Sequence, residues 1–134
     1  MLNKVQLIGR IGKEPEVRTM QSGSKCASFS IATSERWKDK ATGEQQEKTE
    51  WHRIVVFNDN LVGVVEKYLH KGGLVYIEGQ LATRKYEKDG KEYYTTEVVL
   101  KFNGVIRSLS SATKDGIEGV ASDAQPVQDD DIPF

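Results

Sequence analysis

The sequence holds one cysteine, two histidines and three prolines among its 134 residues, and it lacks any long apolar run. A single cysteine, Cys26, excludes an internal disulfide and a zinc site built from cysteines. No segment approaches the roughly 18 apolar residues of a membrane-spanning helix. The first residues alternate like a strand, unlike a signal peptide. We therefore expect a cytoplasmic protein with no membrane partner.

The composition is that of a small globular protein, with 37% hydrophobic and 29% charged residues. Its net charge of −1 conceals an uneven distribution. Residues 1–109 carry 18 Lys and Arg against 14 Asp and Glu, a net charge of +4, whereas residues 110–134 carry one against six, a net charge of −5. A basic body with an acidic tail predicts a polyanionic partner for the body and a different partner for the tail.

The body is typical of an all-β protein, because apolar and polar residues alternate and β-branched and aromatic residues are frequent. A long polar segment, 35–48, is predicted to be a solvated loop. Asp89-Gly90 has the composition of a hairpin turn. Together the runs predict a five-stranded OB-fold barrel with one short helix. The predicted strands cover residues 5–11, 27–32, 51–57, 74–86 and 93–109.

One segment, 61–69, has its apolar residues at helical spacing. Asn58 or Asp59 is predicted to cap its start, and Gly72-Gly73 to end it. After Leu109 the chain has few large apolar residues, and we expect it to be disordered because it cannot bury enough surface to offset its ordering entropy. The predicted organisation is a domain over 1–109, a linker over 110–128 and a tip over 129–134.

The strand from Trp51 to Phe57 carries the strongest functional signal. Alternation places Trp51, Arg53, Val55 and Phe57 on one face, and His52, Ile54 and Val56 on the other, which is a candidate core face or subunit interface. Two aromatic rings about 20 Å apart with a cation between them suit the stacking of unpaired bases. The alternative is that both rings belong to the core and Arg53 is an edge charge.

Two further clusters favour nucleic acid. Arg84 and Tyr86 share one face of a strand that ends at a hairpin, and Trp37 lies among cations in a polar segment. Aromatic rings interleaved with Lys and Arg combine base stacking with phosphate neutralisation. Each cluster alone is also compatible with a solvated loop anchored by one ring.

The last six residues combine three carboxylates with a stiff apolar end. They suit a small apolar pocket on a basic partner surface, although acidic ends often serve only solubility. The predicted partner-binding residues are Asp129, Asp130, Asp131, Ile132, Pro133 and Phe134.

Signals for catalysis are weak. The two histidines, His52 and His70, have no evident convergent ligands for a metal. The glycines near residue 9 lack the Lys-Ser/Thr ending of a phosphate-binding loop. Cys26 has no histidine near it in sequence and is interpreted as structural. We therefore predict no catalytic residues, no metal and no cofactor.

Five segments resemble the bacterial single-stranded DNA-binding protein family. The likeness covers about residues 2–107 and the tip, and it is carried by 14–18, 49–53, 76–81, 94–98 and 130–134. The combination is far more specific than any one part. The resemblance implies an OB barrel, a homotetramer, and a tip that recruits replication, recombination and repair enzymes.

The resemblance also implies which residues contact the strand. The base-stacking positions would be Trp37, Trp51, Phe57 and Tyr86, and the phosphate contacts would be Lys40, Arg53, Lys71, Arg84 and Lys85. Three departures stand out. Tyr86 replaces a frequent tryptophan, Asp59 lies near a common lysine position, and the linker is shorter than in many relatives.

The sequence therefore predicts sequence-independent binding and protection of single-stranded DNA, at the nucleoid. The sequence leaves two alternative functions open. One is an OB module of the primosome or of translation that binds RNA or protein, which a preference for RNA would support. The other is a small nucleic-acid-processing enzyme, which metal-dependent cleavage would reveal.

Overall fold

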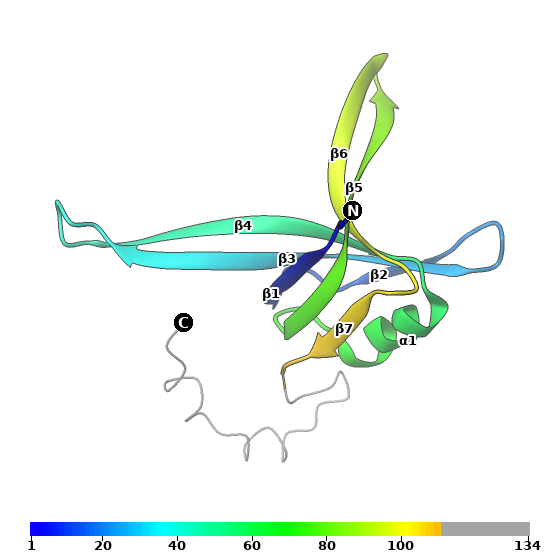
Figure 1. Cartoon of the computed structure of the whole chain (residues 1–134), viewed down its shortest axis with the longest axis horizontal. Coiled ribbons are helices and arrows are strands. Elements are labelled where there is room, and N and C mark those ends of the chain that lie inside the picture. Colours follow the sequence, from blue (N-terminus) through cyan, green and yellow to red (C-terminus); the bar gives the residue numbers. More distant parts are fainter. Residues whose placement is uncertain (111–134) are drawn as a thin grey trace.

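The computed structural model describes residues 1–110, which form a barrel of strands with a single short helix beside it (Figure 1). The predicted disorder, nearly all of the predicted linker and the tip at 129–134 lie outside the described residues. The elements are β1 (Val5–Ile11), β2 (Glu16–Thr19), β3 (Lys25–Lys38), β4 (Gln45–Val56), α1 (Asp59–Tyr68), β5 (Leu74–Lys88), β6 (Lys91–Leu100) and β7 (Val105–Ser108).

Five strands close into a ring in the order β1-β3-β4-β6-β5, and the pairing of β1 with β5 completes it. Every pair in the ring is antiparallel except β4 with β6, whose register aligns Ile54 with Val98. This ring of five strands with one helix confirms the predicted OB-fold barrel. Strand β2 pairs with β3 and β7 pairs with β5, outside the ring.

The core lies inside the ring and against the helix. It is built from the inward-facing residues of each strand and from two helical valines, Val62 and Val65, that are fully buried. Alternation accounts for the strand contribution, since Ala27, Phe29 and Ile31 are buried while their neighbours are not. The barrel therefore presents its other face to solvent.

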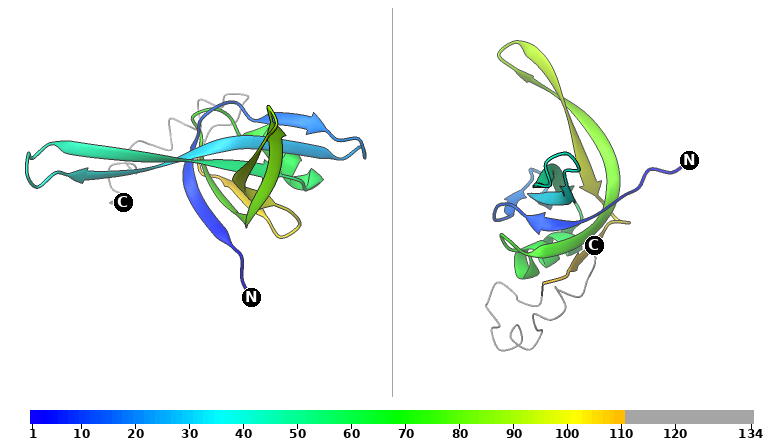
Figure 2. Two further views of the ribbon diagram at one scale, coloured as in Figure 1. Left: turned by 90° about the horizontal axis from the view of Figure 1, so that it is seen from above. Right: turned by 90° about the vertical axis from the view of Figure 1, so that its left-hand side faces the viewer.

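Helix α1 lies at one end of the barrel (Figure 2). The predicted cap is confirmed at Asn58, whose side-chain oxygen accepts from Asn60 N at 2.9 Å. The helix ends at Tyr68 with Leu69 as its C-cap, before the predicted stop at Gly72-Gly73. Within residues 1–110 no helix has the length and apolarity to cross a membrane.

Two hairpins extend well beyond the barrel, one from β3–β4 and one from β5–β6 (Figure 1). The first corrects the prediction of a solvated loop over 35–48, because β3 continues to Lys38 and β4 begins at Gln45. Only residues 39–44 form the connecting turn.

The loop prediction failed because a two-stranded ribbon outside the barrel faces water on both sides and so needs no apolar alternation. Cross-strand polar pairs support it instead. Arg36 Nε donates to Glu47 at 2.9 Å, and the hydroxyls of Ser34 and Thr49 lie 3.0 Å apart.

The second hairpin confirms the predicted turn, with Asp89 at φ 56° and Gly90 at φ 79°, the left-handed geometry of a tight hairpin. The predicted strand over 93–109 is wrong in its middle, because a turn separates β6 from β7. Gly104 N donates to the carbonyl of Lys101 at 3.0 Å there. Strand β2 was not predicted, since its four residues are too few to show a period.

Candidate nucleic-acid interface

The predicted aromatic face of β4 is confirmed. Trp51 is 61% exposed and Phe57 is 40% exposed, whereas Ile54 and Val56 are fully buried in the core. The alternative of two core aromatics is therefore excluded, and Ile54 and Val56 belong to the core rather than to a subunit interface. His52 is partly buried, and its Nε2 lies 2.8 Å from Thr33 Oγ1.

A buried carboxylate organises the middle of this face. Glu97 of β6 is only 5% exposed, and it accepts from Arg53 Nε at 2.8 Å and from Arg84 Nε at 3.1 Å. The register explains the meeting. Arg53 and Glu97 come directly before Ile54 and Val98, the first pair of the parallel β4–β6 ladder. Arg84 lies two positions along β5 from Ala82, the partner of Glu97, and so on the same face.

The two ion pairs orient the guanidinium groups. Both use the Nε atom, which leaves the terminal nitrogens as donors for a bidentate oxyanion such as phosphate. The hydrogen bond from Arg84 to Glu97 raises the pKa of Arg84 above its ordinary value, so this arginine stays charged. The sequence analysis did not predict a role for Glu97. The one feature that could have indicated it is the position of this carboxylate directly before the buried run that begins at Val98.

Strands β2 and β3 supply the other wall of a cleft of about 200 Å³ beside the two arginines. Arg18 of β2 lies opposite Cys26 of β3 in the strand register, and both line this cleft together with Phe57. Burial raises the pKa of the Cys26 thiol, and the positive charge of Arg18 partly offsets the shift. The lining residues are Arg18, Cys26, Ser28, Arg53, Val55, Phe57, Arg84 and Glu97.

A close backbone approach positions Trp51 at the other end of the face. A Cβ atom added to Gly12 would lie 2.4 Å from Cζ3 of the Trp51 ring, so the indole lies directly against this glycine. The predicted Lys71 is exposed in a nearby turn, where Gly72 N donates to the carbonyl of Ile11 at 2.8 Å. The structure thus brings Trp51 and Lys71 to one end of the barrel.

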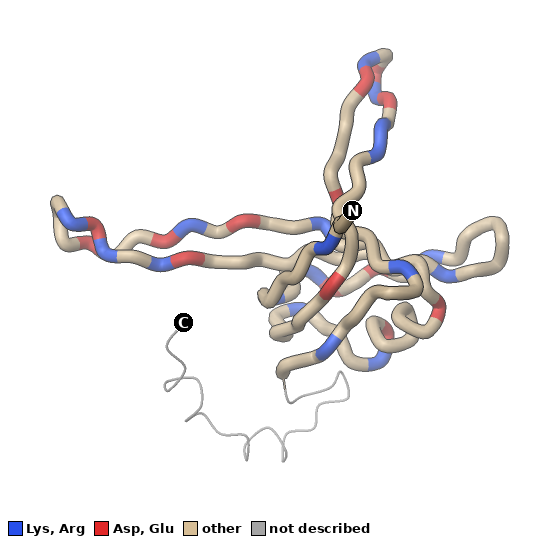
Figure 3. Tube along the Cα trace, in the orientation of Figure 1, with Lys and Arg blue, Asp and Glu red and all other residues tan. Residues whose placement is uncertain are grey.

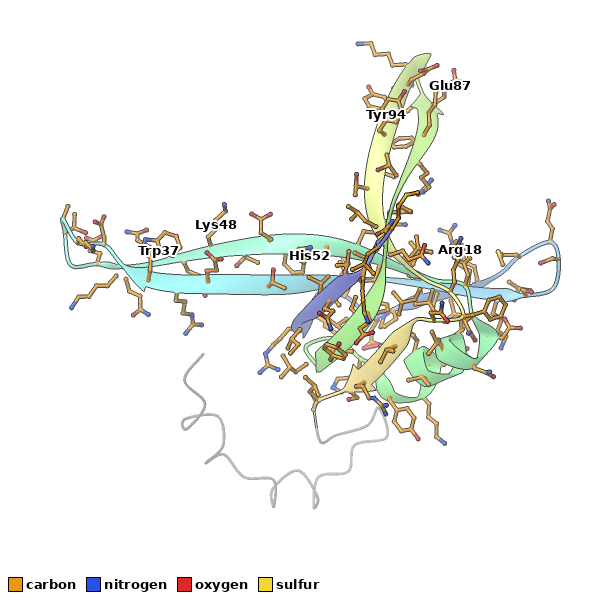
Figure 4. The ribbon with its side chains drawn as sticks, viewed as in Figure 1. Arg18, Trp37, Lys48, His52, Glu87 and Tyr94 are labelled. Atoms are coloured by element: carbon orange, nitrogen blue, oxygen red, sulfur yellow. The ribbon has the colours of Figure 1, made fainter. Side chains whose placement is uncertain are left out.

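Trp37 and Lys40 lie apart from the rest of the predicted set. Trp37 pairs with Gln46 and Trp51 pairs with Ala32, so five ladder steps, about 17 Å, separate the two indoles along the ribbon. Figure 4 shows Trp37 far along the ribbon, beyond the barrel. Both Trp37 and Lys40 are exposed, and the odd number of steps places Trp37 on the opposite face of the ribbon from Trp51, so the structure does not bring these two residues to the central cleft.

The β5–β6 hairpin carries Tyr86 and a second ring that the sequence analysis did not name. The rings of Tyr86 and Tyr93 stack with their centroids 5.5 Å apart. Tyr86 and Tyr93 are equally far from the Asp89-Gly90 turn and lie opposite each other in the strand register. Their pairing could therefore have been predicted from the sequence. The predicted Lys85 is exposed and pairs with Glu92 at 3.0 Å.

Charges of both signs alternate along the two ribbons (Figure 3). Most of these surface pairs contribute little to stability, because solvent screens them. Arg53 and Arg84 differ from them, since they share one buried partner. Within residues 1–110 no group of three or more His, Cys, Asp or Glu side chains is arranged to hold a metal ion.

The model of the single-strand binding protein family matches residues 2–106. The chain belongs to that family. This membership confirms the resemblance stated from the sequence, and it covers nearly the whole of the described barrel.

Curated relatives agree with the family model. The single-stranded DNA-binding proteins of Rickettsia felis and Rickettsia conorii are each 54% identical over 112 residues, which is 82% of this chain and 74% of each relative. Among solved structures, a Plasmodium falciparum SSB in complex with ssDNA has a TM-score of 0.74 and 45% identity, covering 81% of this chain and 96% of that one.

Proposed function

We propose that this protein binds single-stranded DNA without regard to base sequence and protects it during replication, recombination and repair. The observation that carries the proposal is the face of β4, where Trp51 and Phe57 are exposed on either side of Arg53, which Glu97 orients. Aromatic faces accept any base, and the arginines neutralise the backbone. The protein acts as a binding protein rather than an enzyme.

The proposed mechanism is selective binding of the unpaired form. Bases stack on the exposed rings while phosphates contact Arg53, Arg84 and Lys71, so only a strand with free base faces can fill the site. Binding one form displaces the equilibrium between a hairpin and an open strand by mass action. The solved relative from Plasmodium falciparum, which was determined with ssDNA, supports this reading.

We propose that the chain assembles as a homotetramer. The outer face of β1 and β5 supports self-association, because Ile8 is 55% exposed there opposite Tyr76. The surrounding polar groups are already bonded to one another. Tyr76 donates to Glu78, which also pairs with Lys4 at 3.1 Å.

We further propose that residues 110–128 act as a flexible linker and that residues 129–134 recruit replication, recombination and repair enzymes. The support is the sequence, in which three aspartates precede the apolar residues Ile132, Pro133 and Phe134. Such a segment suits a small apolar pocket rimmed by positive charge. Its proposed place of action is the cytoplasm, at the nucleoid.

The test is a titration of intrinsic tryptophan fluorescence with oligo-dT, repeated with duplex DNA, with RNA of matched sequence and at several salt concentrations. We expect strong quenching by oligo-dT and little by duplex. The logarithm of affinity should fall against the logarithm of salt concentration with a slope of about −0.7 per phosphate neutralised. An equal response to duplex, or a marked preference for RNA, contradicts the proposal.

A further inference from the structure

Two phenylalanines leave the barrel at the same end of the β4–β6 pair. Val56 and Leu100 form the last pair of this parallel ladder, and Phe57 N still donates to the carbonyl of Leu100 at 3.0 Å. Phe102 follows two residues later. Both phenyl rings line one cleft of about 420 Å³, together with Ser24, Asn58, Asp59, Asn60 and Lys101.

Phe102 has no evident role in folding. It is 91% exposed at the tip of the turn between β6 and β7, which Gly104 N closes by donating to the carbonyl of Lys101. The middle positions of such turns favour Gly, Asn, Asp and Pro, whose backbone or side chain suits the turn. Phe102 is also not isolated, because it lines one cleft with the exposed Phe57, and two exposed rings in one cleft form an apolar patch that suits a ligand.

The Phe102 cleft continues the nucleic-acid face. Phe57 lines both this cleft and the smaller one that holds Arg18, Arg53 and Arg84. A strand that stacks on Trp51 and passes the arginines to Phe57 therefore reaches the cleft of Phe102 next. Continuity thus favours a nucleobase of the same strand as the occupant.

The charges around the cleft favour a base inside it and a phosphate at its edge. Asp59 lies in the wall, and one of its carboxylate oxygens accepts from Lys25 N at 3.1 Å. A carboxylate repels a phosphate, whereas Lys101, which also lines this cleft, attracts one. Among residues 1–110 Lys101 has no ion-pair partner within 4.0 Å, so its charge is available to the backbone.

We propose that the cleft between Phe57 and Phe102 binds one further base of the strand, with Phe102 as a stacking residue and Lys101 as its phosphate contact. This inference rests on the proposed function and extends it to a subsite that the sequence analysis did not predict.

The test compares Phe102→Ala with the full-length parent in titrations against oligo-dT of increasing length. We expect the dissociation constant to rise roughly 5- to 150-fold on long oligomers, and to change little on oligomers too short to reach the cleft. Thermal unfolding should be unchanged, because the ring is exposed. Tyr68→Ala is the matched control, since Tyr68 is an exposed ring beside Lys67 that lies outside both clefts.

Two further variants sharpen the test. Phe102→Leu keeps an apolar side chain without a ring, and it should bind as weakly as Phe102→Ala if stacking is the cause. Lys101→Gln should reduce the magnitude of the salt slope by about 0.7, the value of one lost phosphate contact. A photo-crosslink from 5-iodouracil in a bound oligomer should map to Phe102 in the parent protein.

The possible outcomes distinguish failure of the Phe102 subsite from failure of the proposed single-stranded DNA binding. If Phe102→Ala binds every oligomer as the parent does, the subsite is wrong while single-strand binding stands. If the parent does not bind oligo-dT, the proposed function itself fails. If Phe102→Ala keeps DNA affinity but loses binding of a synthetic peptide of residues 129–134, the cleft belongs to the tip and the base subsite is refuted.

Discussion

Arg53 and Arg84 come from different strands and bond the same carboxylate, each through its Nε atom. Their shared partner, Glu97, is almost completely buried, whereas both arginines reach solvent. The geometry holds two positive charges side by side on the surface that the DNA would contact. Without the carboxylate, the same two charges would repel each other.

We predict that Glu97→Gln lowers the free energy of unfolding by roughly 1–3 kcal/mol, because charged hydrogen bonds are lost at a buried site. Urea denaturation measures the effect, with an unchanged m-value expected. Glu92→Gln on the same strand is the control, since its exposed pair with Lys85 contributes under about 1 kcal/mol. Equal losses in both variants would contradict the central role of Glu97.

Removal of the Trp51 ring should weaken binding on every sequence. We predict that Trp51→Ala costs about 1–3 kcal/mol of binding free energy on oligo-dT and on mixed sequences alike, because stacking does not read base identity. Competition titrations against a labelled oligomer measure it. An unchanged affinity would mean that Trp51 is not a stacking platform.

The Gly12→Ala variant tests whether DNA binding depends on the position of the Trp51 ring, since it keeps the ring but displaces it. The added methyl group would occupy the space of the indole, which must then move. Because the ring is the exposed end of a side chain, we expect a shifted tryptophan emission and weaker DNA binding with little change in stability. Normal binding by this variant would show that the strand tolerates a displaced ring.

The single thiol is a direct reporter of the arginine cleft. Burial raises the pKa of Cys26, and the thiolate is the reactive form, so alkylation should be slower in the folded protein than in urea. We predict that saturating oligo-dT slows it further and that duplex DNA does not. Mass spectrometry of the labelled fraction measures the rate, and an equal rate with oligo-dT would place the strand elsewhere.

The raised pKa of Cys26 also makes the stability of the folded protein depend on pH. Because the pKa of Cys26 is higher in the folded state, the stability linked to its protonated thiol is complete below the pKa of the unfolded chain. It is lost as the pH rises through the folded-state pKa. Cys26→Ser should remove this contribution, which denaturation at alkaline pH would detect.

The exposed Ile8 should hold copies of the chain together. We predict that Ile8→Glu shifts the protein from tetramer towards smaller species, because a carboxylate would be buried without a partner in the interface. Sedimentation velocity measures the change, and circular dichroism should show an intact barrel. Ile8→Leu keeps the apolar bulk and should remain assembled. A monomeric parent would refute the tetramer.

Deletion of residues 132–134 should separate the two proposed activities. We predict nearly unchanged affinity for oligo-dT and loss of binding to replication and repair enzymes, because the apolar end is the part that fits a pocket. Deletion of residues 120–122 is the control, since it shortens the linker but keeps the tip. Equal loss of DNA and enzyme binding would refute this division of function.

Local pattern was enough to predict the elements that depend on neighbouring residues. Alternation over 51–57 correctly separated the exposed rings from the core, since side-chain direction in a strand follows its period of two. The helix cap was predicted at Asn58 or Asp59 and lies at Asn58, and Asp89-Gly90 was correctly predicted as a turn, because both signals depend on the chemistry of one or two residues. The basic body and acidic tail were likewise visible in the sequence.

Tertiary structure decided which distant residues meet. The ribbon over 35–48 forms from cross-strand pairs that no single strand reveals. Arg18, Glu97 and Phe102 join the interface only because the ring closes and sets β2, β6 and the turn after β6 beside β4. Strand register is a long-range property, so the sequence alone determined which faces are apolar, aromatic or charged. Closure of the barrel determined which of them form one site.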